Sequence, residues 1–282
     1  MKEMLHFTSR KAFEENSKLI HCITNPISIN DCANAILCLG AQPIMAEHPA
    51  EAAEITAGAD ALALNIGNIT DARMEAIPLS LSEANLKNIP SILDMVGVGC
   101  STLRQKFIHE LLQKNKPTVL KGNLSEWMVF LGQENHVRGV DVSAADQKRS
   151  LDDILPPLCA YVRQNKVIAL ISGKTDIVTD GNRAFAIHNG CSLMGRLTGT
   201  GCMMNVVTAA FLAIEPPLEA TVHAAAFYGA AGEKAAENAK LPGSFHVALM
   251  NALASLSDEE FEKYRSFLAK CWRCTLERTA LL

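Results

Sequence analysis

The sequence has no long apolar run and no cluster of basic residues. Hydrophobic residues make up 49% of the 282-residue chain. Yet no stretch reaches the roughly 18 uncharged apolar residues that a membrane-spanning helix needs. The net charge is −4, and no basic run favours nucleic acid as a partner. Residues 1–6 lack the apolar core of a signal peptide. We therefore expect a cytoplasmic protein.

Repeats, low-complexity segments and linkers are also missing. The simplest organisation is therefore a single domain over residues 1–282. The nine cysteines are an odd number, scattered through apolar and helical segments, which is typical of reduced thiols. Cys271 and Cys274 form the one C-x-x-C. We expect them on a helix from Asp258 to about Thr275, where they lack the second pair of a zinc site.

Strand and helix patterns alternate along most of the chain. Apolar strands are expected at 19–24, 43–46, 61–67, 91–96, 118–122 and 167–173, followed by a hairpin of 176–179 and 183–187 with an Asp-Gly turn. Helices are expected at 8–18, 29–39, 47–57, 70–88, 101–115, 124–131 and 144–165, the last broken by Pro156-Pro157. Residues 133–143 are polar and predict a loop. The alternation predicts an α/β fold with a central, mostly parallel sheet covered by helices on both faces.

A glycine-rich turn lies directly before an apolar helix that begins near Gly201. Gly199, Thr200, Gly201 and Cys202 form this turn. The first turn of a helix presents unpaired N–H groups and partial positive charge, which favour a phosphoryl group. Cys202 would lie at the mouth of this anion hole, where the helix field favours the thiolate. The alternative is a simple connection in which Cys202 is a small buried hydrophobe.

Polar residues follow several of the expected strands. Asn123 and Glu126 share a face at the start of a helix, and with Asp94 they are candidates to hold Mg²⁺ through water. The alternatives are a helix cap for Asn123 and a first-turn carboxylate for Glu126. Asp94 has apolar neighbours, so it needs a partner or an ion. Lys121 is either a solvated charge or a phosphate contact.

Taken in order, these motifs resemble one known family. They are His21-Cys22-Ile23-Thr24-Asn25, residues 30–34 and 40–46, Asn65-Ile66-Gly67, residues 93–99, Gly122-Asn123-Leu124-Ser125-Glu126, Ser172-Gly173, residues 176–181 and Thr198-Gly199-Thr200-Gly201-Cys202-Met203. The chain resembles hydroxyethylthiazole kinase, a thiamine-salvage enzyme of the ribokinase-like superfamily, over roughly residues 19–250. The ordered set is far more specific than a single glycine motif.

The resemblance implies a ribokinase-like fold and a homotrimer with the thiazole site near the subunit boundary. It implies ATP-dependent, magnesium-dependent phosphorylation of the hydroxyl of 4-methyl-5-(2-hydroxyethyl)thiazole. Four residues would line the thiazole site: Asn25, Met45, Gly67 and Gly199. Two would contact ATP, Lys121 and Ser172, and three would organise Mg²⁺ and the phosphates, Asp94, Asn123 and Glu126. Cys202 falls where most ribokinase-like enzymes have an aspartate base.

Three positions depart from the family pattern. Met95 replaces a proline, Lys121 replaces an arginine and Ser172 replaces a threonine. Lysine keeps the charge but loses the planar fork of arginine, so the nucleotide preference stays open. The alternatives are a hydroxymethylpyrimidine kinase, an NAD(P)H-hydrate dehydratase and a binding or sensing protein that kept the fold. The dehydratase usually has an aspartate after its Gly-Thr-Gly, where this chain has Cys202.

Overall fold

The computed structural model describes residues 8, 10–15, 17–133, 151–264 and 272–273. Nine strands within these residues form one sheet in the order β2-β1-β3-β4-β5-β6-β7-β8-β9. They are β1 (Leu19–Ile23), β2 (Gln42–Ile44), β3 (Ala61–Asn65), β4 (Ser91–Asp94), β5 (Val119–Asn123), β6 (Ile168–Ser172), β7 (Asp176–Thr179), β8 (Arg183–Ile187) and β9 (Trp272–Arg273). The first six strands pair in parallel, and β7 to β9 are antiparallel additions. The predicted mostly parallel sheet is confirmed.

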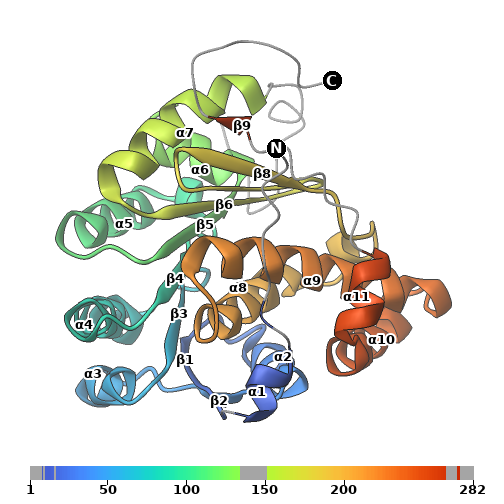
Figure 1. Ribbon diagram of the computed structural model, residues 1–282. Helices are drawn as coiled ribbons and strands as arrows, with labels where there is room; N and C mark the ends of the chain where they lie inside the picture. Colours follow the sequence, from blue (N-terminus) through green and yellow to red (C-terminus); the bar gives the residue numbers. More distant parts are fainter. Residues whose placement is uncertain (1–7, 9, 16, 134–150, 265–271, 274–282) are drawn as a thin grey trace.

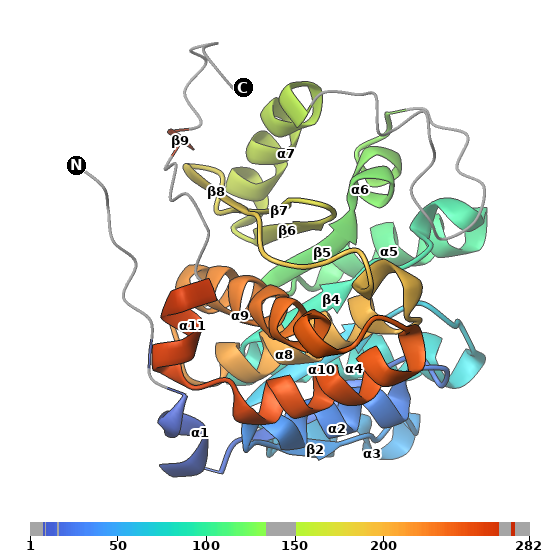
Figure 2. The same ribbon diagram turned by 90° about the vertical axis from the view of Figure 1, so that its right-hand side faces the viewer.

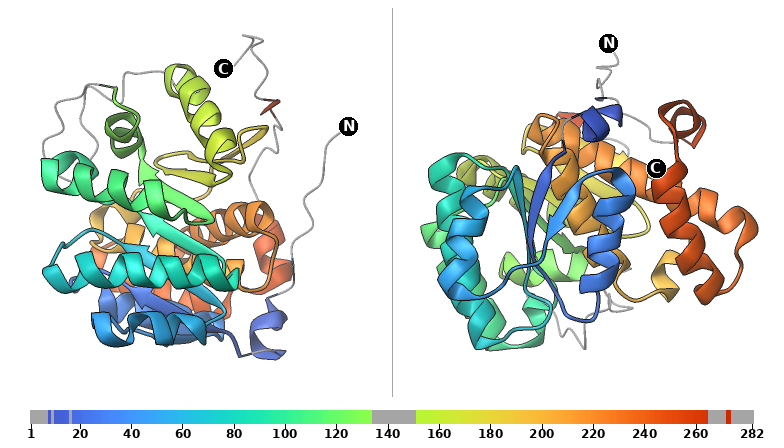
Figure 3. Two further views of the ribbon diagram at one scale, coloured as in Figure 1. Left: turned by 90° about the vertical axis from the view of Figure 1, so that its left-hand side faces the viewer. Right: turned by 90° about the horizontal axis from the view of Figure 1, so that it is seen from below.

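Helices cover both faces of the sheet (Figure 1). One face carries α3 (Pro49–Ala57), α4 (Asp71–Lys87), α5 (Thr102–Lys114), α6 (Leu124–Phe130) and α7 (Leu151–Asn165). The other carries α2 (Ile29–Leu39), α8 (Thr200–Leu212) and α9 (Pro217–Asn238), with α10 (Pro242–Ser255) packed outside them. Figure 2 shows this second face, with α11 (Asp258–Tyr264) and the short α1 (Lys11–Glu15) at its border, and Figure 3 shows the first face.

Burial on both faces explains why the central strands lack apolar–polar alternation. On β3, Ala61 and Ala63 pack into the core beside α2, α8 and α9, whereas Leu62 and Leu64 pack into the core beside α4 and α5. Successive side chains of a strand point to opposite faces, so both sets must be apolar. Small residues face the α8 side and leucines the other, which lets α8 lie directly on the carboxyl half of β3.

Several helix boundaries follow from the capping residues. Thr70 and Ser101 are N-caps whose hydroxyls accept hydrogen bonds from Arg73 N and Arg104 N, both at 3.3 Å. Gly40 ends α2 in the left-handed conformation, with φ of 93°. These residues satisfy backbone groups that a helix end leaves without partners. The predicted starts of α4 and α5 and the end of α2 are confirmed.

Three expectations about the outer elements were wrong. The helix predicted over 8–18 is limited to α1, Lys11–Glu15. α7 continues through Pro156 and Pro157, because Ile154, Leu158 and Val162 are fully buried at helical spacing and their packing outweighs the missing backbone bonds. The helix predicted from Asp258 to about Thr275 is described as α11 over Asp258–Tyr264, but Trp272–Arg273 pairs with β8 as a strand. Cys271, Cys274 and most of the predicted loop lie outside the described residues.

The topology places a switch point between β1 and β3. The chain leaves β1 for β2 on one side and then returns to β3 on the other. Ligands in open parallel sheets bind beyond the carboxyl ends of the strands at such a point. Asn25 and Gly67 follow the carboxyl ends of these two strands. In the part of the chain that the structure describes, no helix is both long and apolar enough to cross a membrane.

Candidate active site

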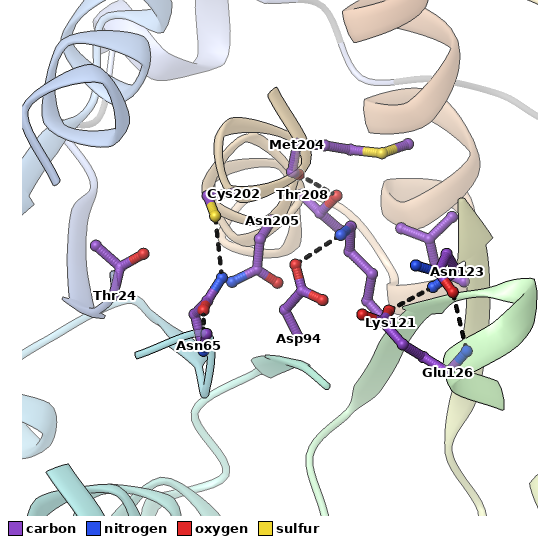
Figure 4. A network of polar contacts seen from close by, with 12 residues as sticks. Thr24, Asn65, Asp94, Lys121, Asn123, Glu126, Cys202, Met204, Asn205 and Thr208 are labelled. Carbon is purple, nitrogen blue, oxygen red and sulfur yellow. Dashed lines mark hydrogen bonds and ion pairs between the residues drawn. The ribbon is translucent and has the colours of Figure 1, made fainter. Parts of the chain in front are cut away.

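A buried ion pair joins β4 to β5 at the carboxyl edge of the sheet (Figure 4). Asp94 and Lys121 are register partners on these strands, and Lys121 Nζ lies 2.6 Å from Asp94 Oδ2. Their side chains are 0% and 3% exposed, so the interpretation of Lys121 as a solvated charge is wrong. Burial alone would lower the pKa of Lys121. The carboxylates of Asp94 and Glu126 outweigh it and raise that pKa, which keeps the ammonium charged.

The start of α6 forms a reciprocal capping arrangement beside this pair. Asn123 Oδ1 accepts a hydrogen bond from Glu126 N at 2.9 Å, and Glu126 Oε2 accepts one from Asn123 N at 2.7 Å. Glu126 Oε1 accepts a third from Gly97 N at 2.8 Å, which ties the loop after β4 to α6. The cap interpretation of Asn123 is confirmed. Burial, followed by the charge of Asp94, raises the pKa of Glu126 to about 7.

The region around Asp94 and Glu126 suits a cation bound through water better than one coordinated directly by several side chains. Among the described residues, no group of three or more His, Cys, Asp or Glu side chains could hold a metal ion. Both oxygens of Glu126 already accept backbone N–H groups. Asp94 Oδ1 is buried and makes no hydrogen bond within the described chain, so one carboxylate oxygen is available to a ligand or to its water. Magnesium keeps several waters, and one such oxygen with a second carboxylate nearby fits it.

The N-terminus of α8 faces the Lys121 ammonium. Gly199 is the N-cap, with φ of 85°, and a Cβ there would lie 3.0 Å from Ser28 Cβ. Met203 N makes the helix-start bond to Gly199 O at 2.8 Å, so the amides before it have no carbonyl partner within the helix. A Cβ on Gly201 would lie 3.8 Å from Lys121 Nζ. The ammonium and the helix terminus therefore point at the same space, and both attract an anion.

Thr200 closes the turn with its side chain. Its hydroxyl donates to Met194 O at 3.0 Å and to Leu197 O at 3.3 Å, both in the loop before α8. Any contact of Thr200 with a ligand in this arrangement would come from its backbone amide.

Cys202 lies in the first turn of α8 and is buried, with Asn65 Nδ2 3.3 Å from its Sγ (Figure 4). Burial, followed by the charge of Asp94, raises the pKa of this thiol. Hydrogen bonding by Ser28 and Asn65 and the charge of Lys121 act in the opposite direction but do not reverse it. The expectation of a thiolate was therefore wrong. Desolvation and a neighbouring carboxylate outweigh the field of the helix end.

Two of the expected thiazole residues lie against each other. A Cβ on Gly67 would lie 2.8 Å from Asn25 Nδ2 and 2.8 Å from Asn65 Oδ1, so only glycine fits between these amides. Gly67 N donates to Asn65 Oδ1 at 2.7 Å. Gly199 joins them through Ser28, whose backbone N–H and hydroxyl both donate to Asn25 O, at 3.0 and 3.3 Å.

Met45 and Ser172 lie at strand ends on either side of this centre. Met45 follows β2, outside β1, and packs half-buried against the core beneath α2 and α8. Ser172 ends β6 and is the register partner of Asn123 on β5. All the expected site residues thus lie at the carboxyl edge or at the α8 terminus that faces it.

The model of the hydroxyethylthiazole kinase family matches residues 11–259. The chain belongs to this family. A relative named hydroxyethylthiazole kinase 2, from Clostridium botulinum, is 40% identical over 252 residues, which cover 89% of this chain and 95% of the relative. A hydroxyethylthiazole kinase from a Thermoanaerobacter species is 39% identical, with 90% and 95% covered. The chain is therefore a phosphotransferase.

Solved structures agree with this assignment. The structure of a hydroxyethylthiazole kinase protein from Pyrococcus horikoshii matches with a TM-score of 0.82 and 36% identity, covering 92% of this chain and 96% of that one. Pyridoxal kinase from Staphylococcus aureus, solved with ADP, matches with a TM-score of 0.57 at 18% identity and shows the fold alone. The predicted ribokinase-like architecture of this family member is confirmed.

Two buried polar residues hold the site of this kinase together, and the sequence assigned neither of them a role, although both lie within the motifs of the family resemblance. Asn65 links Cys202 to Gly67 through its two amide ends. Asp176, at the start of β7, accepts a hydrogen bond from Gly173 N at 2.9 Å, next to Ser172. The signal for Asn65 is a fully buried amide at the end of an otherwise apolar strand, the same signal that singled out Asp94. The short segment around Asp176 predicted only a hairpin.

Proposed function

We propose that this protein transfers the γ-phosphoryl group of ATP to the hydroxyl of 4-methyl-5-(2-hydroxyethyl)thiazole, in thiamine salvage. The observation that carries the proposal is the convergence of the Lys121 ammonium and the α8 N-terminus, where a Cβ on Gly201 would lie 3.8 Å from Lys121 Nζ. Phosphoryl transfer depends mainly on in-line positioning and on neutralising charge. Membership of the hydroxyethylthiazole kinase family supports the choice of acceptor.

In this proposal the two substrates meet at the α8 terminus. The thiazole lies beside Asn25, Met45, Gly67 and Gly199. ATP approaches from the side of Lys121 and Ser172. The amides of Thr200, Gly201 and Cys202 stabilise the charge on the moving phosphoryl group. The Cys202 side chain lies at the same place, either as a neutral thiol that forms part of the anion hole or, in the thiolate form that rises with pH, as the group that receives the hydroxyl proton.

We further propose that Mg²⁺ accompanies ATP. Asp94 Oδ1 would reach it through water, with Glu126 and Asn123 on the same side. The ion would neutralise phosphate charge and hold the phosphates in line. On the protein side, Lys121 holds Asp94 in place through Oδ2.

We also propose that the protein forms a homotrimer, with the thiazole site near the subunit boundary. The proposal further includes a single domain over residues 1–282 and a cytoplasmic location. Ile27 is 71% exposed and lies two residues from Asn25, whose Oδ1 accepts a hydrogen bond from Ile27 N at 3.0 Å. In such a trimer a partner subunit would cover this side chain. Single exposed apolar residues are common on protein surfaces, so the trimer itself rests on the family resemblance.

The purified protein is expected to release ADP from ATP and Mg²⁺ only when hydroxyethylthiazole is present. A coupled ADP assay with and without the thiazole measures this directly. Thiazole-dependent turnover would support the acceptor and would exclude a sensing protein that merely kept the fold.

Two other substrates serve as the comparison in the same assay. Turnover with the hydroxymethylpyrimidine alcohol but not with the thiazole would assign the chain to the pyrimidine kinases. Conversion of NADH hydrate would assign it to the dehydratases. Either result would leave the fold unchanged and would contradict the proposed acceptor.

Cys202→Asp is expected to retain activity, at or above the level of the parent protein. A carboxyl group ionises at lower pH than a thiol, and burial and Asp94 raise the pKa of the Cys202 thiol further, so the aspartate variant should hold more of its proton acceptor in the ionised form at neutral pH. Steady-state rates between pH 6 and pH 9 test this. The parent rate should rise with pH more steeply than that of the aspartate variant. A folded but inactive Cys202→Asp protein would contradict a role as proton acceptor, and Cys202→Ala gives the contribution of the anion hole without the side chain.

A further inference from the structure

One arginine from α5 reaches across two loops at the carboxyl edge of the sheet. Arg104 Nη2 donates to Gly67 O at 2.7 Å, and Arg104 Nη1 donates to Ile66 O, both in the loop after β3. The same Nη1 donates to Val96 O at 3.0 Å, in the loop after β4. A single guanidinium thus binds three backbone carbonyls from two neighbouring loops.

In the proposed reaction, the loop after β3 belongs to the thiazole site and the loop after β4 belongs to the phosphate side. The loop after β3 contains Gly67, which lies against Asn25 in the proposed thiazole site. The loop after β4 follows Asp94, the last residue of that strand, and contains Gly97, whose N–H donates to Glu126 Oε1 at 2.8 Å. Arg104 therefore links the acceptor side to the phosphate side through hydrogen bonds.

The three hydrogen bonds to backbone carbonyls require the guanidinium group of an arginine. Guanidinium carries five donors in a rigid plane, whereas the ammonium of lysine is a single point. Among the described residues no carboxylate pairs with Arg104, so its hydrogen-bonding partners here are backbone carbonyls. Gly97 has φ of 69°, and a Cβ there would lie 3.4 Å from Arg104 Nη1, so the glycine lets the guanidinium approach the loop closely.

We infer that Arg104 is a positioning residue that holds the loop carrying Gly67 and the loop carrying Gly97 in a fixed relative position. The inference rests on the proposed assignment of Gly67 to the thiazole site and of Asp94 and Glu126 to the phosphate side. Arg104 itself acts through the backbone and touches neither reacting group. Without it, the thiazole hydroxyl and the phosphoryl group lose their alignment, although each half of the site keeps its own residues.

The test compares Arg104→Ala and Arg104→Lys with Lys106→Ala. Lys106 is exposed on the same helix and, among the described residues, pairs with Glu110 at 3.8 Å, so it is the matched control. Arg104→Ala is expected to lower kcat/KM for the thiazole by roughly 100-fold, the effect of a misalignment of about 1 Å. The KM for ATP should stay near the parent value, because Lys121 and Ser172 lie on β5 and β6. Arg104→Lys should lose less, since it keeps one donor group near the carbonyls.

A second readout separates positioning from simple stability. Guanidinium at millimolar concentration is expected to restore part of the Arg104→Ala rate and to leave the parent and Lys106→Ala unaffected. Urea unfolding of each variant shows whether the protein is folded, and Arg104→Lys supplies the comparison if the alanine variant is not. Parent-like kcat/KM in the folded variants, an increase in the KM for ATP as large as that for the thiazole, or no rescue would overturn the inference. An inactive parent protein would instead contradict the proposed function.

Discussion

Lys121→Met is expected to lower the free energy of unfolding by about 3–5 kcal/mol, the usual effect of removing one partner of a buried ion pair. The cost arises because Asp94 remains fully buried, without the ammonium that lies 2.6 Å from its Oδ2. The same change removes the positive charge beside the α8 terminus, so kinase activity should be lost as well. Urea unfolding monitored by circular dichroism, together with the thiazole-dependent ADP assay, measures both effects.

Two further variants test whether these effects arise from the charge of Lys121. Lys121→Met combined with Asp94→Asn should recover much of the lost stability, because no buried charge is left without a partner, but it should stay inactive. Lys121→Arg keeps the charge and should retain activity. If Lys121→Met unfolds at the same urea concentration as the parent, the Asp94–Lys121 pair does not hold β4 and β5 together as described.

Local patterns were sufficient to predict most elements of the fold. The strands were visible as apolar runs, and the ends of α2, α4 and α5 followed from Gly40, Thr70 and Ser101, because capping is satisfied by residues within one turn. The edge of the sheet that carries the site also followed, since parallel strands bring their carboxyl ends together. The identity of the family depended on the ordered motifs rather than on any of these patterns.

The sequence predictions that were wrong or missing concern features that depend on contacts between distant segments. The thiol of Cys202 was assigned a lowered pKa from its own helix end. The pKa is instead raised by burial and by the charge of Asp94, and both of these depend on residues that are distant in the sequence. Arg104 carries no local motif and is recognised only when the loops after β3 and β4 are in place. Likewise, the two prolines of α7 predicted a break, because their local cost is visible in the sequence and the core packing that offsets it is not.

Asp176 is expected to make the free energy of unfolding depend strongly on pH. It is buried at the start of β7, and this burial raises the pKa of its carboxyl from 3.8 to about 7, although the hydrogen bond from Gly173 N and the charge of Lys121 oppose the rise. A folded-state pKa above the unfolded value means that the folded protein binds the proton more tightly. The stabilising contribution is therefore complete below about pH 4 and is lost as the pH rises to about 7, a change of up to about 4 kcal/mol.

Asp176→Asn is expected to remove this dependence while keeping an oxygen that accepts the hydrogen bond from Gly173 N. At pH 5 the variant should already be more stable than the parent by about 1.5 kcal/mol, because the unfolded parent carboxyl ionises with a pKa of about 3.9 while the folded parent still holds the proton. At pH 8 the variant should be more stable by about 4 kcal/mol, since it no longer holds a buried negative charge. Urea unfolding at the two pH values measures the difference, and comparison with the parent cancels titrations that both share, such as that of Glu126. A variant that is equally destabilised at both pH values would show that the carboxylate is ionised and well solvated in the folded protein. In that case its role would be limited to ordering the turn beside Ser172.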